Sequence, residues 1–224
     1  MPHRSASVHI GDRGCQFADS VYEVLATVGG HLVDEAPHLV RLARSVNPVR
    51  VVTSRWKRRV DRQLADGGIA VIAIPDIRWQ RCDIKSVALL PNVGEQRAKE
   101  AGDYEAWQAA REGGVSEGTS ANAWIVSADR TVVTRQADSA ILNGVTRLTV
   151  FEIIGRGGYS LVERPLALDE ARAASGGVLT STNVDLLPVV RIDGDPVGSG
   201  VPGPLSRRLR GCCLAHAAAV EGPP

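Results

Sequence analysis

The chain has 224 residues, 44% of them hydrophobic and 23% charged, which is enough to bury a core and is typical of a globular protein. Its 26 lysines and arginines nearly balance 25 aspartates and glutamates, and the formal charge of +1 argues against nucleic acid as a partner. No window approaches the roughly 18 consecutive apolar residues of a membrane helix, and residues 1–14 lack a signal-peptide pattern, so we expect a cytoplasmic protein without a membrane partner.

The first 66 residues predict a small lobe. Residues 17–28 have the pattern of a strand, Gly29 and Gly30 that of a turn, and residues 31–33 that of the returning strand of a hairpin. Two helices follow, because apolar residues recur at helical spacing in two stretches, the second of them behind Ser54 as a candidate N-cap. The apolar residues are Leu39, Leu42, Ala43 and Val46 after Pro37, and then Trp56, Val60 and Leu64.

The rest of the chain predicts strands that alternate with helices. The apolar run at residues 69–74, closed by Pro75, predicts a strand buried on both faces. The sequence ADGG before this run is the best boundary, and it divides the chain into a truncated N-terminal small lobe (1–66) and a larger C-terminal lobe (67–224). Further strands are expected at residues 104–110, 123–126, 178–182 and 188–192, and helices at residues 92–101, 146–154 and 204–219.

The same patterns predict a buried helix face and a turn. In the helix expected at residues 146–154, Leu148, Phe151 and Ile154 fall on one face, which predicts that this face is buried. Asp193 and Gly194 have the composition of a turn after the strand at residues 188–192.

The four cysteines, at positions 15, 82, 212 and 213, do not have the spacing of a metal site. We therefore expect free thiols in a reducing compartment and no metal.

Lysine is rare in this chain, so lysine chemistry has few candidates. Lys57 and Lys99 lie in charged runs typical of solvated helix surfaces. Lys85 instead precedes the apolar residues 87–90, where burial would lower its pKa and leave a neutral, nucleophilic amine.

Five motifs carry a resemblance to a known family. They read DRGCQFADSVYEV at residues 12–24, DIRWQRCDIKS at 76–86, SEGTSANA at 116–123, ILNGVTR at 141–147 and LTST at 179–182. In this order they resemble the D-amino-acid transaminase branch of the class IV (fold-type IV) aminotransferases, over nearly all of residues 68–209 and separately over residues 8–46. The resemblance implies a two-lobed α+β fold whose C-terminal lobe binds pyridoxal 5'-phosphate (PLP).

The resemblance implies roles for three catalytic residues. Lys85 matches the lysine that holds the cofactor covalently and then moves a proton between substrate and cofactor. Glu117 matches the carboxylate that pairs with the pyridine nitrogen, which keeps the ring protonated as an electron sink. Tyr22 matches a tyrosine that helps to orient the substrate. Without the resemblance, Glu117 would be an ordinary surface acid in a Ser-Glu-Gly turn, and Tyr22 a half-buried strand aromatic.

Further residues are implied for the cofactor. The segment Gly144-Val145-Thr146 opens a helix, whose N–H groups and dipole favour a phosphate, although a helix start without any ligand has the same pattern. In the family the matching residues are those that bind the phosphate or pack on the ring. They are Arg41, Leu142, Gly144, Val145, Thr146, Ser181 and Thr182, besides Lys85 and Glu117.

The chain also departs from the family pattern. The family has further strands where this chain runs from Leu64 to Gly68, and they carry an Arg-x-His pair that binds the substrate carboxylate. By composition only, Arg13 and Arg81 are candidates to replace this cation. Only residues 1–7 precede the first matching strand, Ala121 and Asn183 replace hydroxyl residues, and residues 93–95 are one residue short of the usual helix.

The resemblance implies a ping-pong reaction that moves the amino group of a D-amino acid such as D-alanine to a 2-oxo acid such as 2-oxoglutarate. It also implies a homodimer with sites at the lobe and subunit interfaces. Three alternatives stay open: a branched-chain aminotransferase, an aminodeoxychorismate lyase relative, and a catalytically impaired PLP-binding protein that lacks its substrate lobe.

Overall fold

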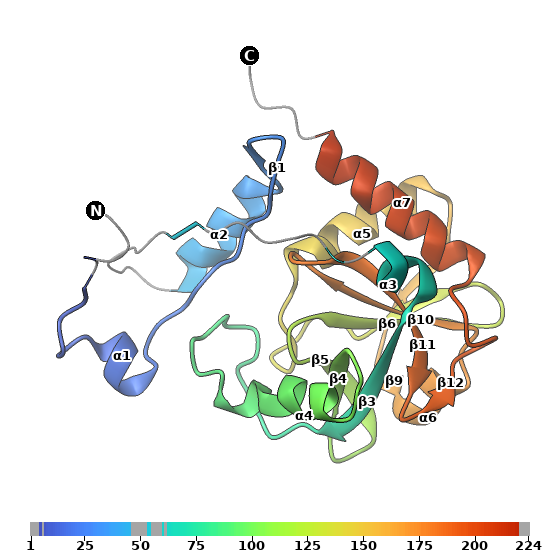
Figure 1. Cartoon of the computed structure of the whole chain (residues 1–224), viewed down its shortest axis with the longest axis horizontal. Helices are drawn as coiled ribbons and strands as arrows, with labels where there is room; N and C mark the ends of the chain where they lie inside the picture. Colours follow the sequence, from blue (N-terminus) through green and yellow to red (C-terminus); the bar gives the residue numbers. More distant parts are fainter. Residues whose placement is uncertain (1–4, 6, 46–52, 55–59, 61, 220–224) are drawn as a thin grey trace.

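A computed structural model describes the whole chain except residues 1–4, 6, 46–52, 55–59, 61 and 220–224 (Figure 1). Its N-terminal part, drawn in blue, lies beside the large sheet that the rest of the chain forms. The N-terminal elements are α1 (Arg13–Phe17), β1 (Thr27–Val28), β2 (His31–Leu32), α2 (Glu35–Ser45) and α3 (Arg62–Gly67).

The strand predicted at residues 17–28 is wrong. Asp12 caps α1 by accepting the Cys15 N–H at 3.1 Å, and Ala18 ends this helix in the left-handed region at φ 53°. The extended residues that follow have only one short neighbour in the described chain, an isolated antiparallel bridge between Val21 and Ser86. A strand needs partners along its length, so regular pairing is confined to β1.

The predicted hairpin turn and the first predicted helix are confirmed. Gly29 and Gly30 both have positive φ, at 59° and 90°, as a tight two-residue hairpin requires. Helix α2 begins two residues before Pro37, which sits in its first turn, where a missing N–H costs nothing. Most of the helix predicted behind Ser54 lies outside the described residues, as does Lys57, and α3 contains its last apolar residue, Leu64.

The large sheet has ten strands in the described chain, in the order β8-β7-β6-β10-β11-β3-β4-β5-β9, with β12 paired to β11. At its centre β3 (Ile69–Pro75) runs parallel to both β11 (Asp185–Ile192) and β4 (Glu105–Ala109). The remaining strands are β5 (Gly114–Gly118), β6 (Asn122–Val126), β7 (Val132–Thr134), β8 (Leu161–Glu163), β9 (Leu166–Ala167), β10 (Gly176–Ser181) and β12 (Asp195–Pro196).

The strand predicted from the apolar run at residues 69–74 and the four further strands predicted after it are confirmed to within three residues, as β3, β4, β6, β10 and β11. The expectation that β3 is buried on both faces is wrong for its second half, where Ile72 and Ile74 are half-buried. The element packed there, α4 (Gly94–Glu100), is only about two turns long and covers it partly. Asp193 and Gly194, with φ 53° and 85°, form the predicted turn between β11 and β12.

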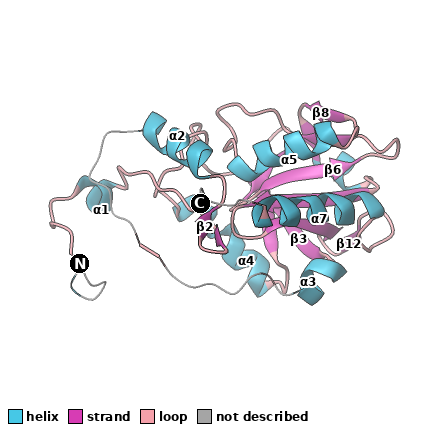
Figure 2. Cartoon of the chain, turned by 90° about the horizontal axis from the view of Figure 1, so that it is seen from above, coloured by secondary structure: helices cyan, strands magenta, loops and turns pink. Residues whose placement is uncertain are grey.

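Helices α5 (Val145–Arg156) and α7 (Pro204–Ala218) lie side by side over β10 and β11 (Figures 1 and 2). They enclose an apolar cluster that contains Trp124, Ile154 and Leu209. Two shorter elements complete the helices, a 3₁₀ turn at Leu90–Val93 before α4 and α6 (Leu168–Arg172) after β9.

The predicted buried face of α5 is partly wrong, because Leu148 is 39% exposed while Val150 and Ile154 are buried. Arg147, the residue before Leu148, is buried instead, with its guanidinium against the Phe151 ring and paired with Glu163. The buried side of α5 therefore includes a charged residue that the apolar pattern did not predict.

The short strands β5, β7, β8, β9 and β12 and helices α1 and α6 were not predicted, because two to five residues are too few to display a period. The turn suggested for Ser116-Glu117-Gly118 is wrong, since these residues end β5, which pairs with β4. Every strand of the large sheet follows residue 68, and the division into lobes at residues 66 and 67 stays a prediction.

Candidate active site

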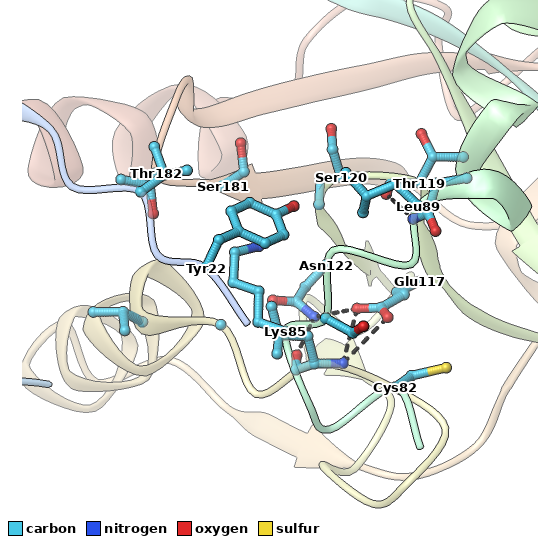
Figure 3. A pocket seen from close by; sticks show the side chains of 18 of the residues that line it. Tyr22, Cys82, Lys85, Leu89, Glu117, Thr119, Ser120, Asn122, Ser181 and Thr182 are labelled. Atoms are coloured by element: carbon cyan, nitrogen blue, oxygen red, sulfur yellow. Dashed lines mark hydrogen bonds between the residues drawn. The ribbon is translucent and has the colours of Figure 1, made fainter. Parts of the chain in front are cut away.

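A cavity of about 330 Å³ opens between the N-terminal segment and the large sheet. All ten residues predicted for the site line it, and the close view in Figure 3 shows several of them pointing into it. They are Tyr22, Arg41, Lys85, Glu117, Leu142, Gly144, Val145, Thr146, Ser181 and Thr182. These residues come from positions 22 to 182 of the chain, and their individual roles remain predictions.

Lys85 lies in the loop between β3 and α4, and its side chain stands beside Tyr22, with Nζ 4.5 Å from the ring centroid (Figure 3). Burial lowers the pKa of Lys85, and the nearby Arg41 guanidinium lowers it further, while Glu23 and Glu117 oppose both. The loop is held by the N-terminal segment, because the Tyr22 N–H donates to the Lys85 carbonyl at 3.0 Å. A lowered pKa favours the neutral amine, which is the nucleophilic form.

Glu117 projects into the cavity from β5, with its side chain only 6% exposed. The Leu142 N–H donates to its oxygens at 3.1 and 3.2 Å, and Asn122 Nδ2 donates to Oε2 at 3.1 Å. Arg78 Nη1 donates to Oε1 at 2.5 Å. Burial raises the pKa of Glu117 to about 7, against the opposing effect of Arg78 and the N–H donor. A carboxyl group with this pKa can share a proton with a basic ring nitrogen near neutrality.

Arg78 lies in the motif at residues 76–86, and the sequence predicted no role for it. Its guanidinium bridges two carboxylates, Glu117 and Asp76, and makes bonds of 3.0 and 2.8 Å to the latter. Asp76 also accepts from the Ser116 hydroxyl at 2.6 Å. Burial would raise the pKa of Asp76, but the bonds from Arg78 and Ser116 outweigh it and lower the pKa. The signal was the position of Asp76 and Arg78 directly after the central strand.

At the start of α5, Gly144 is the N-cap residue, with φ −62° and ψ 139°. A Cβ built on Gly144 would stand 2.2 Å from Asn122 Oδ1, so the close approach requires glycine here. The first N–H groups of the 12-residue helix α5 follow Gly144. Thr146, in the first turn of this helix, and the end of β10 line the cavity here. Arg41 closes this side of the cavity, and its Nη1 donates to the Asn143 carbonyl at 3.1 Å.

The donor set fits PLP. A phosphate is matched by the start of α5, the Arg41 guanidinium and the hydroxyls of Ser181 and Thr182. The Lys85 amine is a suitable nucleophile for the carbonyl carbon of PLP, and buried Glu117 is a suitable partner for its basic ring nitrogen. One cavity thus combines an anion site, a nucleophilic amine and a proton-holding carboxyl group.

Neither cation suggested for a substrate carboxylate lines this cavity. Arg13 pairs with Asp19 and has a side chain that is 71% exposed, and Arg81 pairs with Asp83 and is 57% exposed. Among the described lining residues the cations are Arg41, Arg78 and Lys85, and both arginines bond to buried carboxylates. The residues with neutral donors include Asn92, Ser120 and Asn183.

Other features of the described residues bear on the kind of site. They contain no group of three histidine, cysteine or acidic side chains placed to hold a metal ion. The four cysteines are free thiols. In the same part of the chain no helix has the length and apolarity needed to cross a membrane.

Comparisons with known proteins agree on one family. The model of the family described as amino-transferase class IV matches residues 49–192. A D-alanine aminotransferase of Bacillus licheniformis is 32% identical over 261 residues, covering 94% of this chain and 92% of the relative. A D-alanine aminotransferase of Staphylococcus aureus (strain MSSA476) is 29% identical, covering 92% of this chain and 90% of the relative.

Solved structures agree with the fold. A branched-chain amino acid aminotransferase of Escherichia coli superposes with a TM-score of 0.82 over 95% of this chain and 90% of that chain, at 18% identity. The branched-chain amino acid aminotransferase of T.th., solved with pyridoxamine 5'-phosphate, has a TM-score of 0.67 at 25% identity, over 74% of this chain and 56% of that one.

The alignment with the Bacillus relative also shows a difference in length. It spans 261 positions, whereas 94% of the 224 residues is about 211, so about 50 positions of the alignment have no residue from this chain. The location of the missing positions between Leu64 and Gly68 stays a prediction.

Proposed function

The chain belongs to the class IV aminotransferases, transferases that use PLP, and we propose that it moves the amino group of a D-amino acid such as D-alanine to a 2-oxo acid such as 2-oxoglutarate. The assignment of the reaction type rests on one observation: the buried Lys85 amine, whose pKa is lowered, lies in one cavity with Glu117 and the start of α5. The preference for D-amino acids is supported by the D-alanine aminotransferases at 32% and 29% identity.

When bound, PLP supplies the electron sink that stabilises negative charge at the substrate α-carbon. In our proposal Lys85 Nζ would hold the cofactor covalently in the resting enzyme. Once the substrate amine displaces it, the freed Lys85 amine would accept the proton from the substrate α-carbon and return it on the cofactor side. Glu117 keeps a proton at the ring nitrogen, which its raised pKa of about 7 permits near neutrality. Leu142, which lines the cavity, would pack on one face of the ring and exclude water from it.

The phosphate is held in our proposal by the N–H groups of Val145 and Thr146, the hydroxyls of Ser181 and Thr182, and the Arg41 guanidinium. Each of these residues lines the cavity, and Gly144 gives the ligand access to the helix start because it has no side chain. Held by these residues, the cofactor would be oriented with respect to the Lys85 amine, which lines the same cavity.

Substrate binding is the weak point of this cavity. Tyr22 lies against Lys85 and orients the substrate, but the two lining arginines already bond to the carboxylates of Glu23, Asp76 and Glu117. A substrate carboxylate would then depend on neutral donors, which hold a charge less firmly than a guanidinium does. Weaker orientation also raises the barrier. We expect measurable but weak transamination of D-alanine, with a high apparent KM.

A coupled assay of D-alanine and L-alanine with 2-oxoglutarate, over a wide concentration range, tests this proposal. Turnover of the D-isomer with saturation hard to reach is the expected result. Saturation at low D-alanine concentration would contradict the weak substrate site. Turnover of the L-isomer alone would overturn the substrate class, and cofactor binding without turnover would identify a catalytically impaired PLP-binding protein.

A branched-chain aminotransferase is the second candidate, and the identity of 25% to the T.th. branched-chain enzyme favours it. L-leucine as the amino donor in the same assay separates the two candidates, because a branched-chain enzyme uses this L-isomer and an enzyme for D-amino acids does not.

We also propose that the protein is a cytoplasmic homodimer. Large apolar side chains are exposed in the segment between β3 and α4, which also carries Lys85, with Leu90 81%, Ile77 69% and Trp79 53% exposed, and exposed apolar residues of this kind suit a subunit interface. The four free cysteines suit a reducing compartment. Light scattering after size exclusion should give a mass near twice the 23.8 kDa of the chain, and a monomeric mass would contradict the dimer.

A further inference from the structure

A buried cluster of three charged or titratable residues lies beside the cavity. Arg41 Nε donates to Glu23 Oε1 and Nη2 to Glu23 Oε2, both at 2.6 Å, and His38 Nδ1 lies 2.9 Å from the same Oε2. The side chains of Glu23, His38 and Arg41 are 4%, 2% and 17% exposed. Burial would raise the pKa of Glu23, but the hydrogen bonds from Arg41 and His38 outweigh it and lower the pKa, so the carboxylate is ionised.

The backbone explains how the three side chains meet. Tyr22 and Glu23 follow Val21, which forms the isolated bridge with Ser86, and their side chains go to different places, because Tyr22 lines the cavity while Glu23 bonds to Arg41 on α2. His38 and Arg41 are three residues apart on α2 and therefore share a face. Two large apolar side chains of this helix, Leu39 and Val40, are 46% and 52% exposed, so polar contacts rather than these two residues attach α2 to the protein.

The same arginine reaches the other part of the fold. Its Nη1 donates to the carbonyl of Asn143, the residue before the N-cap of α5. Glu23 accepts hydrogen bonds from two nitrogens of the guanidinium, Nε and Nη2. Because the guanidinium is planar and rigid, these two bonds also fix the position of its third nitrogen, Nη1. The start of α5 and the Arg41 guanidinium consequently face the cavity together.

We propose that Glu23 and His38 are positioning residues that fix the Arg41 guanidinium at the start of α5, so that the cation for the phosphate is in place before the cofactor arrives. The inference rests on the proposed function in one respect, that the ligand carries a phosphate at this end of the cavity. Preorganisation of this kind raises affinity because the arginine loses little freedom on binding.

Charge and geometry predict opposite effects for Glu23→Gln. The substitution removes a negative charge next to an anion site, so simple electrostatics predicts tighter phosphate binding. It also replaces an acceptor oxygen by a donor NH₂ that faces Arg41 and His38, so loss of positioning predicts weaker binding. The sign of the change in affinity therefore decides between the two.

The test is calorimetric titration of the full chain, freed of cofactor, with PLP and with pyridoxal, which lacks the phosphate. We expect Glu23→Gln to weaken PLP binding by at least about tenfold, equivalent to about 1.4 kcal/mol, and to leave pyridoxal binding within about twofold. Glu35→Gln, the same change at an exposed position of α2, is the matched control and should bind both ligands as the wild type does. Unchanged or tighter PLP binding, or an equal loss for both ligands, would overturn the proposal.

His38 provides a second pair of variants if Glu23→Gln does not fold. His38→Gln keeps a donor for Glu23 and should retain the preference for PLP over pyridoxal, whereas His38→Leu should lose part of it. Equal preferences in both variants would refute the positioning role. In an Arg41→Met background, Glu23→Gln should cause no further loss, because there is no guanidinium left to position.

These outcomes separate the inference from the proposed function. A wild type that does not distinguish PLP from pyridoxal would overturn both. A wild type that prefers PLP but does not turn over D-alanine would overturn the proposed substrate alone, and the Glu23 and His38 variants would still decide the positioning role.

Discussion

Gly144→Ala gives a strict test of the site, because the structure predicts both the size of its effect and the reason. At φ −62° and ψ 139° the backbone of Gly144 is open to any residue, so alanine introduces no backbone strain. The added Cβ would stand 2.2 Å from Asn122 Oδ1, well inside an ordinary van der Waals contact. The Asn122 amide must therefore move by about 1 Å or more.

The size of the destabilisation follows from the two hydrogen bonds that the Asn122 side chain donates. Its Nδ2 donates to Glu117 Oε2 at 3.1 Å and to the Leu142 carbonyl at 2.8 Å. A hydrogen bond to a charged group contributes about 1.5–3 kcal/mol and a neutral one about 0.5–1.5 kcal/mol, so loss of both destabilises the protein by about 2–4.5 kcal/mol. Glu117 loses one of its fixed partners in the same movement.

Urea unfolding of the cofactor-free protein measures this change directly. Gly155→Ala is the matched control in the same helix, since a Cβ there meets nothing within 4 Å, and it should stabilise the protein by up to about 1 kcal/mol. In an Asn122→Ala background the penalty of Gly144→Ala should largely disappear, because the clashing amide is gone. Wild-type stability of Gly144→Ala, or a penalty that persists undiminished without Asn122, would refute the reasoning.

Three further predictions concern the cofactor. Lys85→Ala should abolish the near-violet absorption of the bound cofactor, because Lys99 pairs with Glu95 on exposed α4 and cannot replace it; a band that persists would exclude Lys85. Burial raises the pKa of Glu117 from 4.5 to about 7, so the folded state keeps a proton that the unfolded state releases, and the wild type should lose up to about 3 kcal/mol of stability as pH rises between these values. Glu117→Gln should remove this contribution, so its loss of stability between pH 5 and pH 8 in chemical denaturation should be smaller than that of the wild type by up to about 3 kcal/mol, whereas exposed Glu112→Gln should lose as much as the wild type does. Thr182→Ala removes a hydroxyl proposed for the phosphate and should weaken PLP binding by about 10- to 100-fold in equilibrium dialysis, given about 1.5–3 kcal/mol for a bond to a charged group, and exposed Thr27→Ala should leave it unchanged.

The sequence alone predicted the nucleophilic lysine and the family of the protein. Lys85 was singled out because it precedes an apolar run, and the motif order led to the family, which the comparisons confirm. Long apolar runs such as residues 69–74 were predicted correctly as strands, because a buried strand needs continuous hydrophobicity and that pattern is local. The turn at Gly29 and Gly30 was predicted for the same reason, since two adjacent glycines favour positive φ wherever they lie.

Contacts between distant residues could be decided only by the tertiary structure. Residues 20–24 look like a strand but pair only briefly, because pairing depends on which segment lies alongside. Glu117 looks like a turn residue, and its pKa of about 7 follows from burial among Arg78, Asn122 and the Leu142 N–H.

The cluster of Glu23, His38 and Arg41 gave no signal in the sequence as an ion-pair network. Its members are 15 and 18 residues apart, and the contact of Arg41 with Asn143 spans 102 positions. Residue types and local periods limit the chemistry that a chain can perform. The pKa of a buried group and the direction of a guanidinium depend on neighbours that folding brings from elsewhere in the chain, because burial and hydrogen bonding act through space and not along the sequence.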